Sequence, residues 1–266
     1  MRAADEVRDE QAAAPEAIGL ALHSALASRD VWVRSAAVDT LPACAKGQPE
    51  WADFVARASR DRSPMLRANA LAAIARLDWL ELADCVAPRL ADPAELVRVE
   101  AVETIEWLDL ADQADRLVPL LHGDRSCLVR GYAGWALIEL RGEAACDEVA
   151  SALAGERSPW ARAALRRSIY PWRPEEHLDG LLRSLRSRDH RIVAMLCNHW
   201  PEPDSEEHQA AMARALRAAS GRWDNWLHQS IGAVLAKVEA ATEFGALVLS
   251  EAYLQRVRNR DRTVRQ

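Results

Sequence analysis

Apolar residues recur along this chain in a helical pattern that repeats every 31 to 33 residues. In each copy an arginine directly follows one apolar position, and small or apolar residues stand three and seven positions after it. These three offsets lie on one face of an α-helix, so each copy predicts an amphipathic helix. The arginines that mark the period are Arg34, Arg67, Arg98, Arg130 and Arg162.

The turn before each of these helices has its own pattern. An acidic residue opens the turn, and in three copies a helix-capping residue stands directly before proline: Ser63-Pro64, Asp92-Pro93 and Ser158-Pro159. Proline is favoured at the first position of a helix, so these pairs predict helix starts. A second apolar pattern lies upstream of each turn. Each repeat is therefore predicted to be two antiparallel helices joined by an acidic turn.

The same pattern divides the chain into a single repeat domain over residues 16–258. A polar segment, 1–15, precedes it, and an arginine-rich tail, 259–266, follows it. A last helix, over 240–258, is expected to cap the stack. The predicted helix pairs lie near residues 16–45, 49–77, 79–108, 110–141, 142–172, 174–200 and 204–238.

The order Asp, four or five residues, Val/Leu-Arg, two residues, Ala, three residues, Leu/Ile resembles the second half of a HEAT repeat. The short period and the alanine-rich second helices are most similar to the HEAT-like repeats of the phycobilin-lyase type. This resemblance implies an all-α fold, a right-handed α-solenoid (superhelix) of about seven HEAT-like helix pairs with a C-terminal capping helix. Neighbouring pairs must stack, because one pair cannot bury its own apolar face.

The charge of the chain is uneven. The net charge is −6, and residues 1–133 hold 15 Lys/Arg and 22 Asp/Glu, a net of −7. The negative charge of the chain disfavours general binding to nucleic acid, because attraction to phosphate dominates the affinity of proteins for nucleic acids. The five cysteines are odd in number and form no CxxC pair, which favours reduced thiols in a cytoplasmic protein. Neither a signal peptide nor a membrane-spanning stretch is expected.

The repeated arginines are predicted to be structural. In proteins that this chain resembles, this position is a framework contact, so each arginine is expected to pair with an acidic turn residue of its own or the next repeat. The alternative is a cationic track for phosphate or an acidic peptide. The predicted ladder consists of Arg34, Arg67, Arg98, Arg130 and Arg162 with Asp61, Asp92 and Asp124, and Glu156 is a further candidate partner.

The resemblance also implies that the second helix of each pair lines a concave face. Positions two, five and nine after the arginine, with one neighbour, supply the candidate partner-binding residues: Asn69, Glu100, Glu103, Trp107, Tyr132, Trp135, Glu139, Arg166 and Arg167. Carboxylates beside aromatic rings suit a cationic partner, such as Lys or Arg side chains of another protein. The alternative is that Trp107 and Trp135 fill gaps between repeats and the glutamates are merely solvated.

The sequence contains no GxSxG, HExxH, glycine-rich phosphate loop or CxxC pair, so catalysis is the less favoured hypothesis. The two EEH triplets stand at predicted helix starts, where acidic residues complement the helix dipole. No catalytic residue, metal site or cofactor is predicted.

Three functions stay open. The favoured one is a non-enzymatic protein-protein interaction module, monomeric on its own, that binds a basic partner protein in an inhibitor, immunity-type or scaffold role. The first alternative is a HEAT-like DNA glycosylase or nucleic-acid-binding protein. The second is a bilin lyase-like, chromophore-handling protein, which rests on the resemblance alone.

Overall fold

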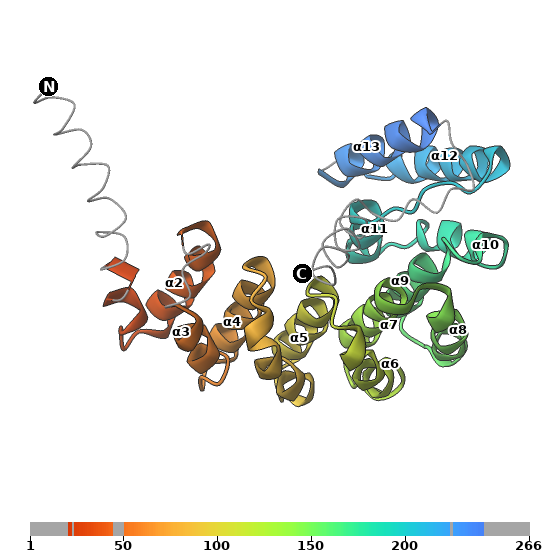
Figure 1. The fold of residues 1–266 in the computed structure, drawn as a ribbon. Helices are drawn as coiled ribbons and strands as arrows, with labels where there is room; N and C mark the ends of the chain where they lie inside the picture. Colours follow the sequence, from red (N-terminus) through yellow and green to blue (C-terminus); the bar gives the residue numbers. More distant parts are fainter. Residues whose placement is uncertain (1–20, 23, 45–50, 224–225, 242–266) are drawn as a thin grey trace, which may run out of the picture. The chain divides into compact units, whose positions relative to one another are not determined.

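The computed structural model describes residues 21–22, 24–44, 51–223 and 226–241, and within these residues every regular element is a helix (Figure 1). The predicted all-α class is therefore confirmed. The N-terminal segment 1–15, most of the predicted capping helix (242–258) and the tail 259–266 lie outside the described residues. The chain forms two compact units, Met1–Leu110 and Ala111–Gln266.

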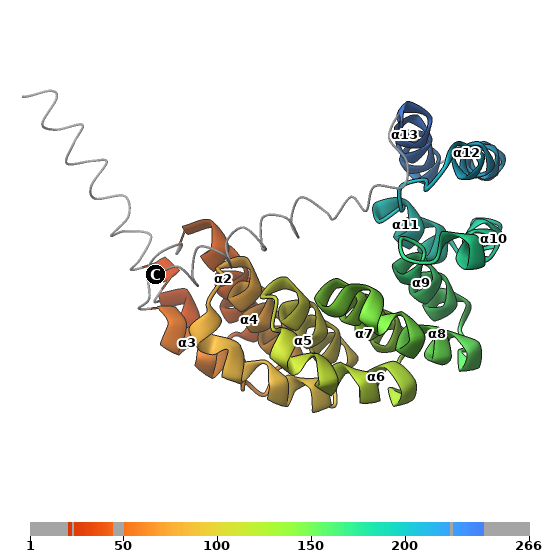
Figure 2. The same cartoon turned by 45° about the vertical axis from the view of Figure 1, so that its right-hand side comes forward.

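In the first unit, three longer helices lie in a row, α2, α4 and α5, as both views show (Figures 1 and 2). Shorter segments pack along one side of α4 and α5 and supply the other half of each repeat. The bounds are α2 (Val31–Cys44), α3 (Ala52–Ala58), α4 (Pro64–Arg76), η2 (Leu80–Cys85), η3 (Ala87–Ala91) and α5 (Glu95–Trp107).

The predicted apolar stripe forms the core of this row. Its members in α4 and α5 are all buried: Leu66, Ala70, Ile74, Val97, Ala101 and Ile105. In α2 the corresponding Ala37 and Leu41 are buried, whereas Val33 is exposed. The period therefore predicts the buried face of each second helix, with one departure at the start of α2.

The first half of the third pair differs from the prediction of an α-helix. It consists of two 3-10 segments, η2 and η3, and Pro88 stands in the first turn of η3. Proline lacks the backbone N–H that an α-helix needs and clashes with the preceding turn, so a continuous helix through this residue is disfavoured.

The turns that end α4 and α5 also repeat. Asp78 and Asp109 both have positive φ, at 53° and 52°. The amide after each donates to the carbonyl five residues earlier, Trp79 to Ile74 and Leu110 to Ile105, at 3.1 and 3.0 Å. This geometry satisfies carbonyls that the helix end would leave unpaired.

The second unit continues with the same alternation of helices. Helices α7, α9, α11 and α13 pack in succession, and α12 packs against α13 (Figures 1 and 2). Its elements are η4 (Ala111–Leu117), α6 (Val118–Gly123), α7 (Cys127–Arg141), η5 (Gly142–Ala145), α8 (Cys146–Gly155), α9 (Pro159–Ile169), α10 (Pro174–Ser184), α11 (His190–Asn198), α12 (Glu206–Ser220) and α13 (Trp226–Ala240).

Two glycines let α7 and α9 approach closely. A Cβ atom at Gly134 would lie 2.2 Å from Cδ2 of Leu165, and one at Gly131 would lie 2.5 Å from Cζ3 of Trp160. Such distances are shorter than packed carbon atoms tolerate, so a side chain at either position would force Leu165 or Trp160 to shift.

Candidate partner-binding surface

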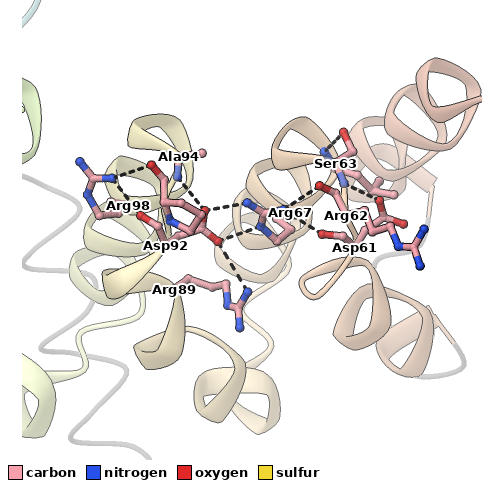
Figure 3. Close-up of polar contacts among 10 residues, drawn as sticks. Asp61, Arg62, Ser63, Arg67, Arg89, Asp92, Ala94 and Arg98 are labelled. Atoms are coloured by element: carbon pink, nitrogen blue, oxygen red, sulfur yellow. Dashed lines mark hydrogen bonds and ion pairs between the residues drawn. The ribbon is translucent and has the colours of Figure 1, made fainter.

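Arg67 and Asp92 form a buried ion pair of the predicted ladder (Figure 3). Arg67 donates from Nε to Oδ2 of Asp92 at 2.8 Å and from Nη2 to Oδ1 at 2.7 Å, a bidentate pair across two repeats. Its Nη1 donates to the carbonyls of Asp61 and Arg62, at 2.8 and 3.1 Å. One guanidinium thus ties its own turn to the next one.

Asp92 is further held by its surroundings. It accepts the amide of Ala94 at 2.9 Å, and Arg89 lies 3.6 Å from it. Burial alone would raise the pKa of this carboxyl, but the hydrogen bonds from Arg67 and Ala94 and the charges of both arginines bring the pKa below its usual value. Asp92 is therefore ionised in the folded protein at neutral pH.

The second unit repeats the arrangement. Arg130 donates to both carboxylate oxygens of Glu156, at 2.6 and 2.9 Å, and to the carbonyl of Asp124 at 2.7 Å. The side chain of Asp124 accepts the amide of Ser126 at 2.7 Å. The hydrogen bond from Arg130 lowers the pKa of Glu156.

The remaining ladder arginines differ from one another. Arg34 donates to the carbonyl of Ser28 at 2.9 Å and reaches Asp61 at 3.4 Å. Arg98 donates to the carbonyl of Asp92 at 2.9 Å. Arg162 is exposed and forms no ion pair within the described residues.

On α5, the candidate residues Glu100, Glu103 and Trp107 follow one another at intervals of three and four residues. Such spacing places them on one face of the helix. Both glutamates are half-buried, whereas Trp107 is 50% exposed. We call these three residues the α5 face.

The two carboxyl groups of the α5 face ionise with difficulty. Burial raises the pKa of Glu100. Burial, together with the charges of Glu100 and Glu106, raises the pKa of Glu103 to about 7. Glu103 is therefore partly protonated at neutral pH, and a cation placed beside it would favour its charged form.

Asn69 of α4 makes contacts inside the first unit. Its Nδ2 donates to the carbonyl and the hydroxyl oxygen of Ser35 in α2, at 3.1 and 3.0 Å. The amide thus links two adjacent second helices.

In the second unit the side chain of Arg167 packs on the ring of Trp135. The guanidinium carbon of Arg167 lies 3.2 Å from the centre of the Trp135 ring, and the His199 ring meets the same ring edge-on at 4.4 Å. Arg167 also donates from Nε to the carbonyl of His199 at 2.6 Å. Burial and the charge of Arg167 lower the pKa of His199 to about 4, so this imidazole is neutral at physiological pH.

Three further candidates lie in this unit. Tyr132 packs at a tilt against Trp160, with ring centres 5.8 Å apart. Glu139 is half-buried near the end of α7. Arg166 lies over Gly180 of α10, pointing toward a neighbouring helix rather than toward Arg167. The sequence did not predict that the rings of Trp160 and His199 contact Tyr132 and Trp135. The one sequence signal for Trp160 is Gly131, because the Trp160 ring occupies the space that a side chain at this position would need.

The described residues contain no group of three or more His, Cys, Asp or Glu side chains that could hold a metal ion. None of their helices is both long and apolar enough to cross a membrane.

Stacked helix pairs with periodic arginines are typical of HEAT-type repeat proteins. Residues 52–138 match the family model of HEAT repeats, so this part of the chain consists of HEAT repeats. A chain in the structure of the complex of CpcE and CpcF of phycocyanin lyase from Nostoc sp. PCC7120 has a similar fold, with a TM-score of 0.58 and 17% identity. That match covers 83% of this chain and 94% of the other. No curated protein matches the sequence. The predicted resemblance to HEAT-like repeats of this type is thus confirmed at the level of the fold.

Proposed function

We propose that this protein is a non-enzymatic module that binds a partner protein through a cationic side chain seated on the α5 face. HEAT repeats generally mediate protein interactions. The observation that carries the proposal is the grouping of an exposed tryptophan with two half-buried carboxyl groups, one of which has a pKa of about 7.

A lysine or arginine of the partner would fit this group for two reasons. Its charge would stabilise the ionised forms of Glu100 and Glu103, which burial disfavours. Trp107 presents an aromatic surface on which a cation can stack, an interaction worth about 0.5–2 kcal/mol. Exposed tryptophans are also frequent anchors of protein interfaces.

The charge of the chain supports a basic partner. The first 133 residues carry a net charge of −7, which would speed the approach of a positively charged surface. An inhibitor of immunity type or a scaffold would both use such a face. The free thiols of Cys85, Cys127, Cys146 and Cys197 support a cytoplasmic location, and we propose a monomer in the absence of the partner.

The arginine framework argues against the nucleic-acid alternative for the first unit. Arg34 and Arg67 face carboxylates there, so their charges are largely neutralised within the protein. A DNA groove would instead need these cations to face phosphates.

Reversing the two charges of the α5 face is expected to abolish most of the partner affinity. With the partner recovered by co-purification from the native cell, Glu100→Lys combined with Glu103→Lys should weaken binding by at least about 30-fold, because the partner's cation would meet two like charges. The dissociation constant is measured by calorimetry at fixed salt.

The control variant makes the same change in net charge elsewhere in the first unit. Glu81→Lys combined with Glu95→Lys alters two exposed residues and should change the affinity by less than about threefold. Equal weakening by both double variants would show that only net charge matters, and the α5 face would then be excluded as the binding site.

A further inference from the structure

A cluster of arginines lies in the second unit, apart from the α5 face. A cavity of about 420 Å³ is lined by Arg162, Arg166, Arg183 and Arg186. Arg183 and Arg186 also line a groove of about 820 Å³, to which Arg214 and Arg222 contribute. We call these six residues the arginine cluster; they come from α9, α10, α12 and the turns that follow α10 and α12.

The cluster lacks counter-ions within the described residues. None of its six guanidinium groups forms an ion pair there, in contrast to Arg67 and Arg130 of the predicted ladder. Asp179 is the one acidic residue among those that line the two spaces. The hydrogen bonds of the cluster go to backbone carbonyls instead: Arg183 to Asp179, and Arg222 to Leu185 and Arg186.

Arg166 shows that the local backbone makes room for a half-buried cation. A Cβ atom at Gly180 would lie 2.5 Å from Nε of Arg166, so the glycine allows the guanidinium to lie across α10. Burial and the charges of Arg162 and Arg183 disfavour the protonated form of Arg166 and lower its pKa. Like charges held together in this way raise the free energy of the unliganded protein.

We propose that the arginine cluster binds a compact ligand with at least two phosphate groups. Four guanidinium groups around one cavity call for dense negative charge; a terminal phosphate group supplies about −1.5 to −2 at neutral pH, and each bridging phosphate adds about −1. The planar guanidinium matches phosphate with two parallel hydrogen bonds. The hydroxyl-bearing residues Ser184 and Ser187 line the same cavity and could add further bonds.

The lining also indicates which part of the ligand is recognised. It contains no aromatic residue on which a nucleobase could stack. The phosphates themselves would therefore carry the affinity, and inorganic tripolyphosphate should bind about as well as a nucleoside triphosphate. Single-stranded nucleic acid has only one charge per nucleotide and fits the dense cluster less well.

Calorimetric titration of the full chain at low salt tests this site with tripolyphosphate, pyrophosphate and ATP as probes. We expect tripolyphosphate to bind with an affinity within about threefold of that of ATP. Arg162→Gln combined with Arg183→Gln should weaken both by at least about tenfold, because two phosphate contacts are lost. The control, Arg157→Gln combined with Arg188→Gln, removes two arginines outside the cavity and should leave the affinity within about twofold.

Stability measurements make sure that loss of binding does not reflect loss of folding. Removing Arg162 and Arg183 relieves repulsion, so the melting temperature of that double variant should equal or exceed that of the parent protein. Tripolyphosphate should raise the melting temperature of the parent but not of the variant.

The proposal is overturned if tripolyphosphate does not bind, if both double variants bind it equally, or if a 12-nucleotide single-stranded RNA binds more tightly. None of these results bears on the α5 face, which lies in the other unit.

Discussion

Asp92→Ala is expected to lower the free energy of unfolding by about 3–5 kcal/mol, a large share of the stability of an ordinary domain. The side chain of Asp92 is 2% exposed and that of Arg67 is 10% exposed, so the variant would leave a guanidinium buried without its carboxylate. It would also remove the acceptor of the Ala94 amide at the start of the following helix. Urea unfolding, followed by circular dichroism and tryptophan emission, measures the loss.

Asp115→Ala is the matched control. Asp115 also pairs with an arginine, Arg141, at 2.7 Å, but its side chain is 85% exposed. A surface pair of this kind contributes about 0–1 kcal/mol. If the two variants lost the same stability, the ladder would be a set of surface contacts and would not hold the repeats together.

Glu103→Gln is expected to stabilise the protein at alkaline pH and to have little effect at pH 5. The folded pKa of about 7 lies above the value of 4.5 for a free glutamate, so the folded state holds the proton more tightly than the unfolded state. Stability is therefore lost as the pH rises from about 4.5 through 7, by at most about 3 kcal/mol. The glutamine variant cannot ionise and should escape this loss.

The measurement is the free energy of unfolding of both proteins at pH 5 and pH 8. Glu95→Gln, an exposed residue of the same helix, serves as the control and should behave like the parent protein at both values. A parent protein that is as stable at pH 8 as at pH 5, with no gain from the substitution, would show that Glu103 ionises like a solvated group.

The repeating features of this molecule could be predicted from the sequence because the same pattern of arginine and acidic turn residues recurs in several repeats. The period aligned Arg67 and Arg130 with acidic turn residues 25 or 26 positions later, and the structure places these pairs in bidentate contact. The stripe of apolar residues likewise indicated which face of α4 and α5 is buried. The 3-10 segments at the third pair were missed, because a single proline there outweighs the pattern of its neighbours.

The candidate site was harder to predict, because the period gives the direction of a side chain but not what lies beside it. Asn69 finds its partner 34 residues away in α2, and Arg167 contacts a carbonyl 32 residues away. The period predicts Trp107 and Trp135 on the same face of their helices. Trp107 is 50% exposed, whereas the ring of Trp135 contacts Arg167 and His199, two residues that the period does not place beside it.

The arginine cluster was missed for a related reason. Arg183, Arg186, Arg214 and Arg222 fall outside the arginine period, in the part of the chain where the repeat weakens. Only the packing of α9, α10 and α12 brings them around common spaces. Clusters of this kind depend on tertiary contacts that no local pattern encodes.

Photo-crosslinking from the α5 face tests the proposed partner site most directly. A photoreactive phenylalanine derivative replaces Trp107, which is 50% exposed, and in a matched protein it replaces Trp226 of the second unit, which is 54% exposed. Irradiation of native cells should give one dominant protein adduct from position 107 and none of that mass from position 226. Equal adducts from both positions, or none from position 107, would contradict the assignment of the α5 face as the binding site.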